Sequence, residues 1–439
     1  MADPQPFLDE KLALACVHCG LCLGACPTYL ETGNENDSPR GRIYLMRAMQ
    51  DGRLPVAGAA VRHVDLCLGC RACEAACPSG VQYGALLEAT RDHIERHHRR
   101  PFFQRVLRQF IIESIFPHPW RMRLALLPAK LVKFLHAEPL LPKFARDALE
   151  LVPDNAREVR LPELSPAIAQ PARGRVGFIS GCVMSVMFGG TNTNSVRLLN
   201  RAGFEVVTPA AQGCCGALFA HGGNLAEARE CARHNIAVFE RLALDSIIIN
   251  AAGCGSTLKE YGHLLHDDAA WRDRAAAFSA KVKDLTEALQ IADCRLPVEQ
   301  TPSPAPSPIC NLQSAICNSP VTYHDACHLA HPQRITRQPR DLVKSVAGAK
   351  FVELPESDVC CGSAGSYNLT EPEMAARLQH RKVEHILSTG ARIVVTTNPG
   401  CILQIRAGLA RAGATDVRAM HIADYLEEAL EVAKRPEPE

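Results

Sequence analysis

The sequence lacks a long apolar run, an excess of charge of either sign and a nucleotide-binding loop. Without about 18 consecutive apolar residues, no segment is predicted to span a membrane. Lys and Arg number 48 against 47 Asp and Glu, a balance that gives no support to nucleic-acid binding. There is neither a G-x-G-x-x-G after a strand nor a Walker P-loop. We therefore predict no flavin or nicotinamide site, and do not expect the chain to oxidise an organic substrate alone.

The N-terminal residues also lack the basic and apolar stretches of a secretory signal. The 20 cysteines are spaced like metal ligands rather than like a disulfide framework, which is typical of a reducing compartment. We therefore expect a cytoplasmic chain, docked at most peripherally on the inner face of the cytoplasmic membrane. Its 439 residues predict two or three domains, because single cores seldom grow beyond about 250–300 residues.

Two cysteine runs near the N-terminus share the pattern C-x2-C-x2-C-x3-C-P, one over residues 16–27 and the other over residues 67–78. This spacing holds a cubane iron–sulfur cluster in bacterial-type ferredoxins, where the fourth cysteine ligates the other cluster. Zinc motifs use pairs of cysteines instead of such triplets. We therefore predict two [4Fe–4S] clusters, one held by Cys16, Cys19, Cys22 and Cys77, and the other by Cys67, Cys70, Cys73 and Cys26.

The cluster module is predicted over residues 1–90 and includes a helix from Arg40 to Asp51 closed by Gly52. Residues 91–165 form a predicted helical connector in which basic and apolar side chains alternate. Our preferred interpretation is a pair of helices packed across the domain junction with a solvated basic face. A basic amphipathic surface that lies on anionic lipid or meets a partner subunit is the alternative.

The remainder of the chain is a duplication, with one copy over residues 175–292 and the other over residues 321–432. Each copy alternates apolar strands with helices and carries a cysteine, a Cys-Cys-Gly triplet and a further cysteine, each after a strand. Residues 293–320 between them are rich in Pro and Ser and are predicted to be an extended linker, in which Cys310 and Cys317 have no assigned role. We thus predict a multidomain α/β protein: an α-helical two-cluster ferredoxin module followed by two α/β lobes with parallel sheets.

Because parallel strands share one carboxyl edge, where open α/β folds bind ligands, the lobe cysteines are candidate metal ligands. Their thiolates suit either a further iron–sulfur cluster or zinc. These residues are Cys182, Cys214, Cys215 and Cys254 in the first lobe, and Cys327, Cys360, Cys361 and Cys401 in the second.

Other polar residues near the cysteines have two interpretations each. Arg40 and Arg42 either neutralise the clusters or brace the helix that they begin; His18 and Arg71 either tune the cluster potential or lie on the surface. His324, Asp325 and His328 flank Cys327, where they could carry protons or simply pack at a strand end. Cys231 and Cys294 have no partner in either motif.

The repeated pattern Cys…Cys-Cys-Gly…Cys resembles the cysteine-rich CCG repeats found in the B subunit of heterodisulfide reductase. A ferredoxin module ahead of two such repeats resembles the glycolate oxidase iron–sulfur subunit and the C subunit of anaerobic glycerol-3-phosphate dehydrogenase. The segment from Asn36 to Leu45 is similar to the glycolate oxidase family in particular. The full CCG pattern ends in C-x-x-C, whereas Thr257 and Gln404 stand at the last position here.

The resemblance implies an iron–sulfur electron-transfer subunit of a glycolate, or other 2-hydroxy-acid, oxidase complex. A partner flavin subunit would oxidise the substrate, and electrons would pass through the clusters to a membrane acceptor such as quinone. Alternatives are a catalytic subunit that reduces a disulfide or heterodisulfide, and the iron–sulfur subunit of a lactate or glycerol-3-phosphate dehydrogenase. Zinc as a structural brace in the lobes also stays open.

Overall fold

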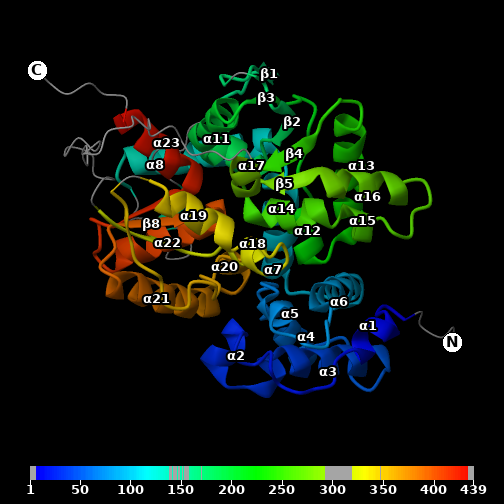
Figure 1. Ribbon diagram of the computed structural model, residues 1–439. Coiled ribbons are helices and arrows are strands. Elements are labelled where there is room, and N and C mark those ends of the chain that lie inside the picture. The colour runs from blue at the N-terminus through cyan, green and yellow to red at the C-terminus, as the bar shows by residue number, and fades with distance from the viewer. Residues whose placement is uncertain are drawn as a thin grey trace, which may run out of the picture.

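The structure is a computed structural model that describes residues 6–137, 158–169, 171–291, 319–346 and 348–433, with isolated positions between residues 141 and 152. The linker cysteines Cys294, Cys310 and Cys317 lie outside the described residues. The α-helical first module and the two lobes with parallel sheets are confirmed (Figure 1). The limits that we assign to the five segments remain predictions.

Short helices joined by tight loops make up the N-terminal module, at the bottom of Figure 1. They are α1 (Glu10–Leu14), α2 (Pro27–Thr32), the 3-10 turn η1 (Glu35–Asp37), α3 (Pro39–Gln50), α4 (Gly58–Asp65), α5 (Ala72–Ala75) and α6 (Tyr83–His97). Helix α3 begins where the Ser38 side chain accepts a hydrogen bond from the Gly41 N–H at 3.0 Å, with Pro39 in its first turn. It corresponds to the helix that we predict from Arg40. Gly41 is required there, since a Cβ would collide with the Glu35 carbonyl.

The first lobe contains a five-stranded sheet in the order β1-β3-β2-β4-β5, parallel except at β1. Its strands are β1 (Leu164–Ser165), β2 (Gly174–Ile179), β3 (Phe204–Val207), β4 (Ser246–Ile249) and β5 (Val282–Asp284). Its helices are α10 (Cys182–Met187), α11 (Gly189–Arg201), α12 (Ala217–Gly222), α13 (Leu225–Phe239), α14 (Ala252–Lys259), α15 (Tyr261–Leu264), α16 (Arg272–Lys281) and α17 (Leu285–Ile291).

The second lobe contains a four-stranded parallel sheet in the order β7-β6-β8-β9. Its strands are β6 (Pro320–Tyr323), β7 (Lys350–Phe351), β8 (Ile393–Thr396) and β9 (Arg418–His421). Its helices are α18 (Cys327–Ala330), α19 (Arg337–Lys344), α20 (Tyr367–Thr370), α21 (Pro372–Ser388), α22 (Pro399–Arg411) and α23 (Ile422–Ala433). In both lobes the first strand of the repeat lies in the sheet interior, so the loops after three adjacent strands meet at one edge.

The two lobes share a hydrophobic core. It joins Phe178 of β2, Tyr323 of β6 and Tyr425 of α23, and none of these three side chains is exposed to solvent. Helix α11 of the first lobe contacts α23, and α17 contacts α19. Burial of this many apolar groups is the main driving force that holds the lobes together.

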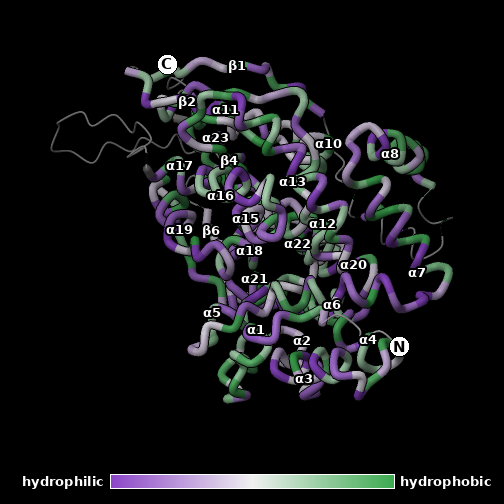
Figure 2. The backbone as a smooth tube through the Cα atoms, turned by 90° about the vertical axis from the view of Figure 1, so that its right-hand side faces the viewer, coloured by the Kyte–Doolittle hydropathy of each residue, from purple (hydrophilic) through white to green (hydrophobic). Residues whose placement is uncertain are grey.

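The connector comprises α7 (Phe102–Val106), the π-helical segment η2 (Leu107–Ile115) and α8 (Pro119–Phe134). Figure 2 shows α7 and α8 at one edge of the molecule. Ile112 and Met122 are buried, yet many large apolar side chains of the connector are 57–85% exposed: Phe102, Phe103, Phe110, Trp120, Leu124, Leu127, Leu131 and Phe134. Our preferred interpretation, in which the connector helices pack across the domain junction, predicts that these apolar side chains are covered. In the structure most of their surface is exposed instead.

Candidate metal centres

The eight cysteines of the two N-terminal runs surround two voids in the helical module. Cys16, Cys19, Cys22 and Cys77 line the first void, together with Cys73. Cys26, Cys67, Cys70 and Cys73 line the second. A donor set made only of thiols on tight loops fits [4Fe–4S] clusters, and each predicted ligand set lies around one void. The assignment of each cysteine to a cluster remains a prediction.

The two cluster loops share one backbone conformation. The residue before the second cysteine of each run has a positive φ, 55° at His18 and 66° at Gly69, and so has the residue after it, 86° at Gly20 and 63° at Arg71. In each loop a left-handed residue stands on either side of the second cysteine, and such alternation of backbone conformation turns successive N–H groups towards the inside of a loop, where they favour an anion. The Gly69 N–H lies 3.4 Å from the Cys67 sulfur. The two runs, which share one cysteine spacing, therefore also share a loop conformation that suits a negatively charged cluster.

Arg42 is the buried positive charge of this module, with 1% of the residue exposed. Its Nε donates to the His63 carbonyl at 2.7 Å, its Nη2 donates to the Thr28 hydroxyl at 3.0 Å, and its Nη1 lies 3.9 Å from the Cys26 sulfur. Burial alone would raise the pKa of Cys67, but the charges of Arg42 and Arg91 hold it below its ordinary value. The position of Arg42 supports the electrostatic interpretation, and its hydrogen bonds to His63 and Thr28 support the bracing one as well.

Arg40 and Arg71 are both bound to neighbouring groups. Arg40 donates to the His18 carbonyl at 2.9 Å and pairs with Glu35, so it ties the start of α3 to the first cluster loop. Arg71 pairs with Glu74 at 2.8 Å and with Glu260 of the first lobe. Arg71 therefore joins the second cluster loop to the lobe instead of lying free on the surface.

In the first lobe, four predicted ligands form a continuous chain of thiols. The sulfurs of Cys182 and Cys214 are 3.7 Å apart. Cys214 interacts with Cys215, and Cys215 in turn with Cys254. Cys231 of α13, to which the motif gives no partner, also interacts with Cys214, so this lobe gathers five thiols. The sequence motif does not indicate Cys231, because this residue lies in α13, outside the Cys-Cys-Gly pattern.

A glycine follows each cysteine pair because a helix passes close to it. Gly216 and Gly362 have φ values of 83° and 87°. A Cβ at Gly216 would lie 3.1 Å from the Ala228 carbonyl, and one at Gly362 would lie 2.6 Å from the Ala375 carbonyl. Only glycine accepts both the backbone angle and the close approach. The same contacts show that α13 and α21 are equivalent, with Cys231 at the position of Leu378.

In the second lobe the predicted ligands form a similar chain. The sulfurs of Cys327 and Cys360 are 4.0 Å apart. Cys360 interacts with Cys361, and Cys361 with Cys401. Lys382 is 2% exposed and contributes its positive charge to this group of thiols. Thiol donors and a buried cation together suit an anionic metal centre.

The second cluster loop lies directly against the second lobe. Cys70 belongs to one apolar cluster with Cys327 and Cys360. Burial, and then the nearby Cys327 thiolate, raise the pKa of Cys70 well above its ordinary value. The Tyr367 hydroxyl donates to the Leu66 carbonyl at 2.8 Å. This is the place where the N-terminal and lobe cysteines approach each other.

Two of the three polar residues beside Cys327 have structural roles. Asp325 accepts two hydrogen bonds from Arg340, at 2.7 and 2.6 Å. The His328 ring donates from Nε2 to the Gly69 carbonyl at 2.9 Å, and packs edge-to-face on His221. Both therefore position loops, and their geometry gives no support to a proton carrier.

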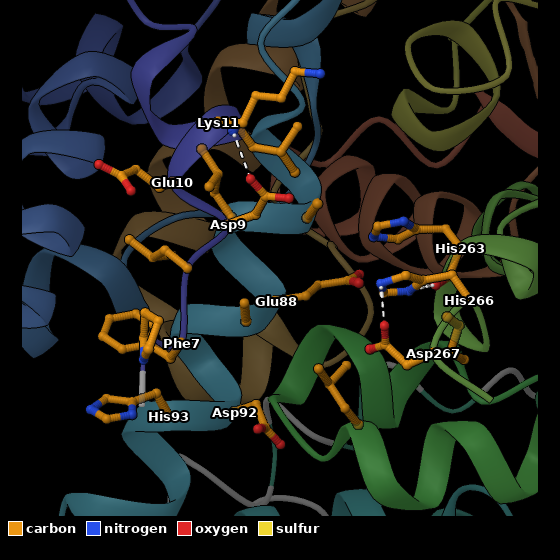
Figure 3. A pocket seen from close by; sticks show the side chains of 18 of the residues that line it. Phe7, Asp9, Glu10, Lys11, Glu88, Asp92, His93, His263, His266 and Asp267 are labelled. Atoms are coloured by element: carbon orange, nitrogen blue, oxygen red, sulfur yellow. Dashed lines mark hydrogen bonds and ion pairs between the residues drawn. The ribbon is translucent and has the colours of Figure 1, made fainter. Parts of the chain in front are cut away.

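A cavity of about 1340 Å³ lies between the N-terminal segment, α6 and the loop between α15 and α16 (Figure 3). Of the residues that line it, Phe7 stacks on His93 with ring centroids 4.1 Å apart, and His266 pairs with Asp267 at 2.8 Å. Among the described residues that line it there is no cysteine. We assign no metal to this cavity.

No helix within the described part of the chain has the length and apolar character needed to cross a bilayer.

Known families match the module and both lobes. A family described as "4Fe-4S dicluster domain" matches residues 12–81, and one described as "Cysteine-rich domain" matches residues 176–259 and 321–406. The N-terminal module is therefore a two-cluster iron–sulfur module, and the cysteine-rich lobes are further candidate cluster sites.

Relatives extend over almost the whole chain. The probable glycolate oxidase iron–sulfur subunit of Bacillus subtilis is 42% identical over 96% of this chain and 95% of its own length. The glycolate oxidase iron–sulfur subunit of Escherichia coli is 33% identical with the same coverage. The B subunit of the fumarate reductase (CoM/CoB) of Methanothermobacter marburgensis is 27% identical over 97% of this chain and 74% of its own length. The chain therefore belongs to the family of glycolate oxidase iron–sulfur subunits.

Proposed function

We propose that this chain is the electron-transfer subunit of a glycolate, or closely related 2-hydroxy-acid, oxidase complex. A partner flavin subunit oxidises the substrate and passes electrons to the N-terminal clusters. The electrons continue through the lobes to a membrane acceptor, for which quinone is our proposal. Family membership supports the iron–sulfur role, and the absence of a flavin or nicotinamide motif in the sequence is consistent with a separate oxidising subunit.

The observation that carries this proposal is that Cys70 lies in one apolar cluster with Cys327 and Cys360 and that their thiols interact electrostatically. In our assignment Cys70 ligates the second cluster, and the other two cysteines belong to the second-lobe centre. Two centres whose ligands share one apolar cluster lie within electron-transfer reach, and burial protects the reduced clusters from water. We therefore infer that electrons leave the N-terminal module at Cys70.

A second contact supports continuation into the first lobe. The side chain of Asn398 donates from Nδ2 to the Cys401 sulfur at 3.6 Å. Its Oδ1 accepts a bond from the N–H of Gly253, the residue before Cys254, at 3.3 Å. Asn398 thus connects the third cysteine loops of the two lobes, and we propose this route for the last transfer within the chain.

We propose that the exposed apolar side chains of α7, η2 and α8 form a membrane contact on the inner face of the cytoplasmic membrane. They include Phe103, 85% exposed, and Phe134, 79% exposed, and the exposed Arg105 and Arg123 lie among them. Aromatic and basic side chains on one surface suit the boundary of an anionic bilayer. Such a contact would bring the chain to the membrane, where we propose that it reduces quinone.

The disulfide-reductase alternative has less support. Thr257 and Gln404, which replace the final cysteine of each repeat, are 4% and 3% exposed. The Gln404 side chain donates to the Ala375 carbonyl at 3.3 Å, and the backbone carbonyl of Gln404 accepts a bond from the Gln379 side chain at 2.6 Å. Gln404 is therefore part of the packing between α21 and α22 and offers no thiolate to a substrate disulfide.

The test is reconstitution with a flavin subunit co-purified from the source of the chain. We expect glycolate to reduce a soluble quinone analogue only when both proteins are present, with lactate and glycerol 3-phosphate as the comparison substrates. Reduction of a disulfide by the chain alone, without a flavin partner, would overturn the proposal.

A further inference from the structure

His324 stands out among the residues around the second-lobe thiols. It follows β6, is fully buried, and has one nitrogen close to the sulfurs of Cys361 and Cys401, with all three ligand atoms within 4.8 Å of one another. Neither ring nitrogen has a hydrogen-bond partner among the described residues that meets normal geometry. Leaving such a buried polar group unsatisfied destabilises the fold. A ligand at this place would remove that destabilisation.

The first lobe shows that the fold itself does not require a histidine here. Counting back three residues from the first cysteine of each lobe gives His324 and Ile179. The sheet register agrees, because the preceding residues Phe178 and Tyr323 pair with equivalent positions of β4 and β8. Ile179 is fully buried in an apolar core. An aliphatic side chain therefore satisfies this position in one lobe, and the imidazole of the other needs a separate explanation.

We propose that His324 is a nitrogen ligand of the metal centre in the second lobe, beside the thiolates of Cys327, Cys360, Cys361 and Cys401. The inference rests on the proposal that the second lobe holds a metal, and deepens it by naming a mixed Cys/His donor set. Thiolate and imidazole together suit zinc and iron–sulfur centres.

The two lobes are then chemically different. The first gathers five thiols, with Cys231 at the position that Leu378 occupies in the second. The second has an imidazole and, at the position equivalent to Asn235, the cation of Lys382. A neutral ligand in place of a thiolate makes an iron–sulfur centre easier to reduce. The second-lobe centre, beside Cys70, is thus the better electron acceptor of the two.

The test uses the full chain, purified without oxygen and reduced by dithionite, so that it does not depend on a flavin partner. For an iron–sulfur centre, pulsed electron paramagnetic resonance should show a coordinated nitrogen that changes when histidine is labelled with ¹⁵N. For a zinc centre, X-ray absorption at the zinc edge should show a nitrogen beside sulfur. Either signal comes from the wild-type protein, so the proposal is decided even where a variant fails to fold.

Variants then assign the nitrogen. His324→Ile, which copies the first lobe, should lose the nitrogen signal and lower the second-lobe metal content, while the iron of the N-terminal module stays in place. His324→Cys should restore the metal but not the nitrogen. His331→Gln is the matched control, because His331 is buried nearby but donates to the Asp358 carbonyl at 3.0 Å. A wild-type second-lobe centre with sulfur ligands only, or an unchanged nitrogen signal in His324→Ile, would overturn the proposal.

Discussion

Replacing Arg42 by Met should lower the reduction potential of the second N-terminal cluster. The guanidinium is buried, with Nη1 only 3.9 Å from the Cys26 sulfur, so solvent screens its charge weakly. For an electron spread over the cube at ~6 Å from this charge and an effective dielectric constant of ~20, Coulomb's law gives ~3 kcal/mol. That energy is ~120 mV for a one-electron couple. Asp37, 3.8 Å from Arg42, offsets part of it, so we expect a decrease of ~50–120 mV.

A redox titration followed by electron paramagnetic resonance measures this shift. Removing the two hydrogen bonds of Arg42 should also destabilise the fold by about 3–5 kcal/mol. Arg42→Lys separates the two effects, because it keeps the charge but loses the planar fork. We expect this variant to retain most of the potential while losing stability. Arg53→Met, at an exposed pair with Asp51, is the matched surface control. An unchanged potential in Arg42→Met would refute the electrostatic role.

Three further predictions concern other parts of the chain. Cys231→Leu, which copies Leu378 of the second lobe, should change the metal spectrum of the first lobe and leave that of the second unchanged. Burial raises the pKa of Asp284 to about 6, so the native state holds the proton of this carboxyl more tightly than the unfolded chain does. The free energy of unfolding should therefore fall by up to ~3 kcal/mol as the pH rises from 4 to 6. Denaturation curves of Asp284→Asn should lack that decrease. Phe103→Ser with Phe134→Ser should reduce co-sedimentation with phosphatidylglycerol vesicles at least severalfold, whereas equal binding would exclude this surface from the membrane contact.

The sequence predicts the architecture well where a repeat or a local motif carries the information. The strands before Cys182 and Cys327 are apolar runs that end at a cysteine, and the structure has β2 and β6 there. Two complete cluster motifs indicate the N-terminal module without any tertiary information. Helix α3 follows from its Ser38 cap and Pro39, which are local signals.

The parts that the sequence does not predict depend on distant contacts. Cys231 joins the first-lobe thiols only because α13 passes close to Gly216. The approach of Cys70 to Cys327 depends on how the module docks on the lobes, which no local pattern encodes. The helical connector reads as amphipathic, but whether its apolar face is covered depends on packing, and Phe103 is left exposed.

The central claim is that electrons from the hydroxy acid enter the N-terminal clusters and reach the lobes through Cys70. Mixing the complex anaerobically with glycolate and freezing it at intervals allows electron paramagnetic resonance to follow each centre. We predict that the N-terminal clusters are reduced first and the second-lobe centre next. Centres that stay oxidised with the flavin partner and glycolate present, or a second-lobe centre that is reduced while the N-terminal clusters never carry an electron, would contradict the account.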